Sequence, residues 1–230
     1  RTVSWMPACF PERLRACFRG LLGLLCALAL LVPAPGAAAA GAWERVRQVN
    51  DGDTVVLEGG TRVRYIGINA PEIDFARGRS EPFAQAARKF NRRLVLHQKV
   101  RLAYDRERED HYGRHLAYVF LEDGTLVNEA LLRAGLAFCL YRSPNDHHRQ
   151  RLLDAQREAL QAGRGIWRVL PGKKGQRYLG NSRSRRFHRP GCPSGEATGR
   201  GQRVVFDSLR EAFWEGFAPG RCCFPRGLAP

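Results

Sequence analysis

Side chains that can bind and cleave a phosphodiester occur close together between residues 51 and 114. Arg64 and Arg114 can each present a planar fork of N–H donors to phosphate oxygens. Glu72 can accept a proton from an attacking water molecule, or orient that water. Asp53 adds a carboxylate within the D-G-D-T sequence at residues 51–54. The joint occurrence of these residue types, in this order, predicts phosphodiester hydrolysis at one pocket.

The same region offers oxygen ligands for a hard cation such as Ca²⁺, which binds carboxylate, amide and carbonyl oxygens. Asp53 can supply a carboxylate, Asn69 a side-chain amide oxygen and Ala70 a backbone carbonyl. A cation held there would polarise a phosphate oxygen and lower the pKa of a bound water molecule. We therefore expect a calcium site beside the two arginines.

Each of these segments has a simpler interpretation when it is taken alone. D-G-D-T is a common turn sequence, and Arg64 could pair with an acid on the surface of a strand. Glu72 follows Pro71 and could interact with the dipole of a helix N-terminus. Arg114 lies in a charged run that could simply be solvated. A functional site is predicted only because the segments occur together.

Short strands with glycine turns alternate with helices in the region that holds these residues. This order predicts the α+β class, with a five-stranded barrel of the OB type packed by three helices. Asn128 and Glu129 are expected to lie near the same pocket. The predicted strands are Trp43–Asn50, Thr54–Leu57, Thr61–Ile68, Lys99–Tyr104 and His115–Leu121, and the predicted helices begin at Glu81 after a Ser80 cap, span Leu126–Ala134, and follow an Asn145 cap.

The two ends of the chain differ from this central domain, which we place at residues 41–170. Residues 1–40 combine arginines, a short apolar run and an alanine-rich A-x-A site, which predicts a signal peptide, with an uncleaved anchor as the alternative. We therefore expect a secreted or periplasmic protein with no membrane segment in its mature form. Residues 171–186 are rich in glycine, serine and arginine, which predicts a linker before a separate small α/β module at 187–230.

The overall composition is that of an ordinary globular protein with a strong basic excess. The 230 residues include 38 Lys+Arg and 22 Asp+Glu, a net charge of +16, and 44% are hydrophobic. This composition excludes a disordered chain, a collagen or a disulfide knot. The positive charge indicates an anionic partner such as nucleic acid. A cell-envelope protein that binds anionic polymers remains an alternative from a different functional class.

Residues 44–168 resemble the staphylococcal nuclease (thermonuclease) family. The resemblance implies an OB-fold barrel with three helices and a calcium-dependent endonuclease, a hydrolase that cleaves DNA and RNA to 3′-phosphate ends. It implies DNA and RNA as partners, and we expect a monomer. The motifs that carry it are DGDT at 51–54, VRYIGINAPE at 63–72, EPFAQAA at 81–87, YGRHLAYV at 112–119 and VNEALLRAGLA at 127–137.

The resemblance also assigns a role to each candidate residue. Arg64 and Arg114 are similar to the phosphate-binding pair and Glu72 to the carboxylate that activates or orients water. Asp53 is similar to the metal carboxylate, with Asp51 as a supporting acid. Tyr112 is similar to a residue near a nucleotide phosphate.

One position departs from the family pattern. Asn69 stands where the family usually has an aspartate that binds the metal. An amide oxygen still binds a cation, but one negative charge is lost, and affinity at oxygen sites depends on ligand charge. We therefore expect weaker calcium binding, with slower or higher-calcium activity. The alternative is a catalytically weakened OB-fold protein that binds nucleic acid without cutting it.

Residues 180–223 resemble a small module that some bacterial nuclease-like proteins carry, which is in turn similar to zinc-binding modules of DNA repair proteins. Four residues could bind zinc: His188, Cys192, Cys222 and Cys223. Their spacing lacks a second C-x₂-C pair. Export favours a disulfide from Cys192 to Cys222 or Cys223 instead.

Overall fold

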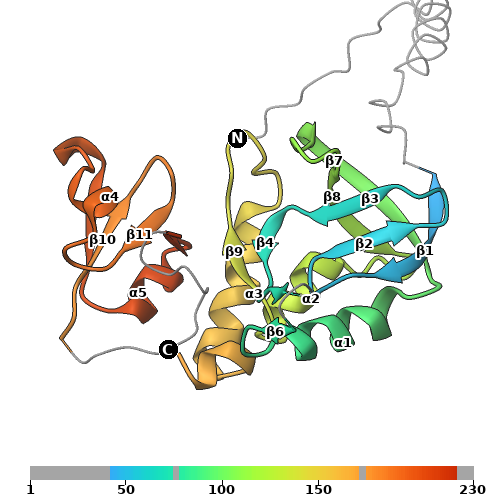
Figure 1. Ribbon diagram of the computed structural model, residues 1–230, viewed down its shortest axis with the longest axis horizontal. Coiled ribbons are helices and arrows are strands. Elements are labelled where there is room, and N and C mark those ends of the chain that lie inside the picture. The colour runs from blue at the N-terminus through green and yellow to red at the C-terminus, as the bar shows by residue number, and fades with distance from the viewer. Residues whose placement is uncertain (1–41, 75–77, 171–174, 222–230) are drawn as a thin grey trace, which may run out of the picture. The chain divides into compact units, whose positions relative to one another are not determined.

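The computed structural model describes residues 42–74, 78–170 and 175–221 (Figure 1). All of the described residues belong to one compact unit, which spans residues 41–230. The predicted signal peptide lies outside the described residues, as do Cys222 and Cys223. In the described ranges, every helix is too short or too polar to cross a membrane.

Five strands close into a barrel, which confirms the predicted fold class. Neighbouring strands are antiparallel except β3 and β8, which are parallel. Around the barrel, the order is β1 (Trp43–Val49), β2 (Thr54–Leu57), β3 (Arg62–Tyr65), β8 (His115–Leu121) and β7 (Lys99–Glu109) (Figure 1).

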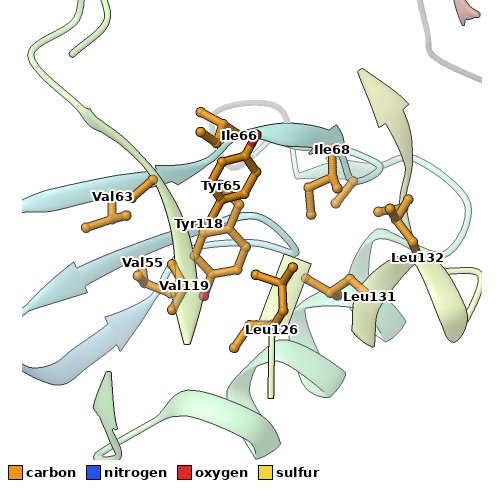
Figure 2. Close-up of a cluster of buried hydrophobic side chains, with 14 of the residues drawn as sticks. Val55, Val63, Tyr65, Ile66, Ile68, Tyr118, Val119, Leu126, Leu131 and Leu132 are labelled. Carbon is orange, nitrogen blue, oxygen red and sulfur yellow. The ribbon is translucent and has the colours of Figure 1, made fainter. Parts of the chain in front are cut away.

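Side chains of β3 alternate between the barrel core and its outer surface, as the period of a strand requires. Val63 and Tyr65 are buried, and Figure 2 shows them in the apolar cluster with Tyr118. Because Arg64 stands between these two buried residues, its side chain emerges on the other face of the strand. The hydrophobic pattern of β3 thus determines where this arginine can act.

The third predicted strand, Thr61–Ile68, is wrong as one element. It divides at Gly67, which has a φ of 78° that only glycine adopts readily. The chain leaves the barrel there, and β4 (Gly67–Asn69) pairs instead with β9 (Phe138–Leu140). This departure carries Asn69 away from the barrel wall. A short hairpin of β5 (Ile73–Asp74) and β6 (Arg79–Ser80) follows.

The three predicted helices of this domain are present, but two of them begin later than expected. They are α1 (Ala84–Val95), α2 (Val127–Arg133) and α3 (Arg149–Gln161). Ser80 lies in β6 and does not cap α1, whose N-cap is Phe83. Asn145 does not cap α3 either, because its buried side chain bonds both backbone groups of Glu107, each at 2.8 Å. That pair of bonds fastens the long end of β7 to the loop before α3.

Asn128 and Glu129 do not join the candidate pocket, which corrects that prediction. The buried Asn128 accepts a hydrogen bond from the Val119 backbone at 3.0 Å and donates one to the Ile66 carbonyl at 2.9 Å. It therefore satisfies backbone groups where β3 ends. Glu129 forms ion pairs with Arg133 and Arg151 on the helices.

The C-terminal part of the chain forms a second sheet. The order of its strands is β12 (Arg203–Phe206), β10 (Tyr178–Asn181), β11 (Arg186–His188) and β13 (Ala218–Pro219). Because β10 lies inside the range predicted as a linker, this sheet begins at Tyr178 and not after residue 186. Short helical segments accompany it: η2 (Gly165–Arg168), α4 (Pro193–Glu196), η3 (Arg200–Gln202) and α5 (Leu209–Trp214).

This C-terminal sheet shares a hydrophobic core with the nuclease-like domain. Trp167 and Phe138 pack edge-to-face against Phe213 of α5, with ring centroids 5.0 and 5.8 Å apart. The buried Gln156 of α3 accepts a hydrogen bond from the Cys139 backbone at 2.6 Å and donates one to the Phe213 carbonyl at 2.5 Å. One side chain thus connects β9, α3 and α5.

Candidate active site

The D-G-D-T turn between β1 and β2 brings Asp53 against the segment that follows β4. Asp51 closes the turn by accepting a hydrogen bond from the Asp53 backbone at 2.9 Å. A Cβ at Gly52 would lie 2.4 Å from the Ala70 Cβ and 2.8 Å from that of Ala87. Only glycine permits this approach, so the turn sequence determines how closely Asp53 meets Ala70.

Asp53 is the centre of a small hydrogen-bonded group. Its side chain is buried, with 4% exposure. One carboxylate oxygen accepts a hydrogen bond from the Ala70 backbone at 2.6 Å and forms an ion pair with Arg64. Arg64 also donates to the side-chain oxygen of Asn69 at 2.8 Å. The structure therefore brings together the three predicted metal-ligating residues and one of the two predicted arginines.

Asp110, which was not among the predicted site residues, orients Arg114. The Arg114 Nε donates to Asp110 at 2.8 Å, and its Nη2 lies 2.7 Å from the same carboxylate oxygen. Burial by itself would raise the pKa of Asp110, but the hydrogen bonds from Arg114 lower it. In the sequence, the acid four residues before Arg114 could have indicated this ion pair. Asp110 therefore holds one edge of the guanidinium and leaves the other for a ligand.

Tyr112 lies beside Arg114 at the surface. Its side chain is 61% exposed, and its ring centroid is 5.4 Å from the Arg114 Cζ. The Tyr112 carbonyl accepts a hydrogen bond from Arg62 at 2.6 Å. This position agrees with a residue at the edge of a substrate site, although Tyr112 is not among the residues that line the cavities described below.

Arg64, Asn69, Glu72 and Arg114 line one cavity of about 400 Å³. The prediction of a shared pocket is therefore consistent with this geometry. Asp53 holds Arg64 through the ion pair described above. Arg114 also lines a neighbouring cavity of about 480 Å³, together with Asp51 and Thr54. Arg114 therefore borders both cavities.

Carboxylates crowd one another in this region. Burial and the charges of Asp53 and Glu72 raise the pKa of Asp51, against the opposing effects of the Asp53 backbone and Arg64, to about 7. Burial and the charge of Asp53 likewise raise the pKa of Glu72, and Arg64 opposes that rise. Because a cation would relieve this repulsion, the electrostatics of the turn fit a bound divalent ion.

The oxygen atoms at this turn suit a hard cation by their chemistry. They include the Asp51 and Asp53 carboxylates, the Asn69 amide oxygen and the Ala70 carbonyl. Within the described residues, no three His, Cys, Asp or Glu side chains are grouped to hold a metal ion. A calcium site here would therefore depend on Asn69 and on backbone oxygen.

The predicted zinc or disulfide residues of the C-terminal sheet lie partly outside the described residues. His188 and Cys192 are buried, with the Cys192 Sγ 3.5 Å from the His188 Nδ1. Cys222 and Cys223 are not described. The described part of the chain gives zinc no support. The choice between zinc and a disulfide stays a prediction.

Comparison with known proteins places this site in a family. The family described as Staphylococcal nuclease homologue matches residues 62–169. The Thermonuclease of Staphylococcus intermedius is 40% identical over 125 residues, which cover 53% of this chain and 74% of that protein. The Thermonuclease of Staphylococcus hyicus is 36% identical over 126 residues, covering 54% and 74%. Endonuclease YncB of Bacillus subtilis (strain 168) is 37% identical over 122 residues, covering 51% and 57%. This chain therefore belongs to the staphylococcal nuclease family.

Proposed function

We propose that this protein is an exported, calcium-dependent nuclease that hydrolyses phosphodiester bonds of DNA and RNA and leaves 3′-phosphate ends. Nuclease activity follows from membership of the family. Calcium dependence, export and cleavage of both DNA and RNA are the parts that this proposal adds. One observation supports the proposal most directly. Two arginines and a glutamate from separate segments line a single cavity beside an acidic turn.

Arg64 and Arg114 bind the scissile phosphate in this mechanism. A guanidinium presents parallel N–H donors that match two phosphate oxygens. Arg64 is held by Asp53 and Asn69, and Arg114 is held by Asp110. Because both side chains are fixed before substrate arrives, their charge is in place when negative charge builds up in the transition state.

Glu72 acts on the water that attacks phosphorus. Its side chain lines the same cavity as the two arginines. The side chain of Glu81 accepts a hydrogen bond from the Glu72 backbone at 2.9 Å, which fixes the backbone at Glu72. The carboxylate accepts the proton of the water or orients the water for attack.

Asp53, Asn69 and the Ala70 carbonyl would hold the calcium ion, with Asp51 as a supporting acid. When bound, the ion would polarise a phosphate oxygen and make the attacking water more acidic. The proposed mechanism in this cavity uses calcium and no zinc.

A calcium titration tests the proposed function. The protein is incubated with denatured DNA or with RNA at increasing Ca²⁺, and the products are analysed for 3′-phosphate ends. We expect cleavage of both substrates that rises with Ca²⁺ and stops when EGTA is added. Cleavage that is unaffected by EGTA would contradict the metal requirement.

A second function, nucleic-acid binding without cleavage, is favoured by one observation. Asn69 supplies no charge, and its side-chain oxygen already accepts a hydrogen bond from Arg64. Salt-sensitive DNA binding in a protein that cleaves neither substrate at any Ca²⁺ concentration would support this second function.

Asn69→Asp is expected to tighten calcium binding by roughly tenfold, or about 1.4 kcal/mol, because it restores a negative ligand. Isothermal titration calorimetry with Ca²⁺ measures the change. Gln98→Glu is a matched control, because Gln98 is exposed and the substitution adds the same charge outside the cavities. Equal affinities for Asn69→Asp and the control variant would rule out residue 69 as a ligand.

A further inference from the structure

The cavity that holds the candidate catalytic residues is also lined by three arginines that the mechanism does not use. Arg142 lies in the loop after β9, Arg186 begins β11, and Arg221 follows β13. Arg186 lies in the C-terminal sheet, and Arg221 lies in the segment that follows it. The cavity is therefore built jointly by the nuclease domain and by the segment that follows it.

These three arginines line the same cavity, where Arg186 has the like charges of the other two nearby. Within residues 42–74, 78–170 and 175–221, none of them forms an ion pair with an acid. Burial, together with the nearby charges of Arg221 and Arg142, lowers the pKa of Arg186 to about 10. An anion bound among them would remove this repulsion.

Contacts within the C-terminal sheet fix the position of Arg186. Arg186 donates to the Pro219 carbonyl at 3.1 Å, and β11 pairs with β13 beside it. The sheet is in turn joined to α3 through Gln156 and Phe213. The charge of Arg186 is therefore held in place before any ligand binds, which reduces the entropy lost on binding.

A second basic cavity continues from the first. It has a volume of about 760 Å³ and shares Glu107, Arg142, Asn145 and Arg186 with the catalytic cavity. Three more arginines line it, namely Arg149, Arg183 and Arg185. Cavities of these sizes hold a few nucleotides of one strand, and basic grooves of this kind follow a single-stranded backbone.

We propose that Arg142, Arg186 and Arg221 bind phosphates of a single-stranded polynucleotide next to the scissile bond, so that the C-terminal sheet lengthens the substrate site. This inference rests on the proposed nuclease function. It assigns the C-terminal sheet a direct part in holding substrate. The adjoining cavity then holds further phosphates of the same strand.

The first test compares cleavage of a long and a short substrate. Arg142→Gln, Arg186→Gln and Arg221→Gln are compared with wild type on a 20-nucleotide single strand and on a dinucleotide, which has only the scissile phosphodiester. For each variant we expect the ratio of kcat/KM for the 20-mer to that for the dinucleotide to fall about fivefold, the value of one charge-assisted contact. An equal loss on both substrates would overturn the proposal, because the arginines would then act at the scissile phosphate.

Binding to the labelled 20-mer in EGTA gives a second readout that does not need cleavage. Fluorescence anisotropy is measured over a range of salt concentrations. Loss of one phosphate contact should reduce the slope of log K against log salt by about 0.7. Arg210→Gln is the matched control, because Arg210 is exposed in the C-terminal part and lines neither cavity. If the three variants show the same slope of log K against log salt as Arg210→Gln, the proposal is overturned.

The two readouts separate this inference from the nuclease proposal. A wild type that binds the 20-mer through these arginines but never cleaves it would refute only the nuclease proposal. Arg142 and Arg221 are exposed, and their side chains make no hydrogen bond within the described residues, so their loss should leave the fold intact. Their variants keep the test valid even if Arg186→Gln unfolds the C-terminal sheet.

Discussion

Arg114→Gln is expected to lower kcat for dinucleotide cleavage by about 10²–10³-fold, the usual loss when one fixed donor to a transition-state charge is removed. Glutamine cannot supply the positive charge or the two parallel donors that the Arg114 guanidinium offers. Asp110, which aligns that guanidinium, would lose its ion pair as well. Steady-state kinetics at saturating Ca²⁺ measure the effect.

Arg47→Gln is the matched control for this experiment. Arg47 is exposed on β1 and lines neither of the cavities that contain Arg114. Its replacement removes the same charge from the same domain, so it corrects for the change in overall attraction to nucleic acid. A loss for Arg114→Gln of less than tenfold relative to this control would show that Arg114 does not contact the reacting phosphate.

Glu72→Gln is expected to reduce kcat by about 10²–10⁴-fold, the range for loss of a general base. Glutamine has nearly the size of glutamate, but it cannot accept the proton of the attacking water. Because Glu72 is not proposed to bind the phosphate, KM should change far less than kcat. Initial rates over a range of substrate concentrations separate the two constants.

Glu122→Gln provides the comparison for Glu72→Gln. Glu122 is exposed in the turn after β8, and it lines neither cavity at the site. Near-equal kcat values for Glu72→Gln and Glu122→Gln would exclude Glu72 from proton transfer. A rise in KM with kcat preserved would instead indicate that Glu72 helps to bind substrate.

Local sequence patterns were sufficient to predict the barrel. Alternation of apolar and polar residues identified β1, and the period of a strand is independent of distant residues. Gly52 and the acids beside it identified the turn that holds Asp53. Arg64, Asn69, Glu72 and Arg114 line one cavity, and each lies at or near the end of one of these local elements.

Features that depend on distant contacts could not be predicted in this way. Asn145 has the residue type of a helix cap, but it bonds Glu107, which is 38 residues away. The chain leaves the barrel after Tyr65 because β4, which begins at Gly67, pairs with β9, and that pairing becomes visible only in three dimensions. Arg186 belongs to a range that its composition marked as a linker, so nothing local connected it with Arg64.

The position of Gln156 has a consequence for how this protein can change over evolution. Its side chain holds β9 and α5 together, and Phe138, Leu160 and Trp167 of the nuclease domain are covered in the same core as Phe213. A gene that lost the codons for the C-terminal sheet would leave these apolar side chains facing water. A shorter descendant would therefore need compensating polar substitutions at these positions before the deletion could be tolerated.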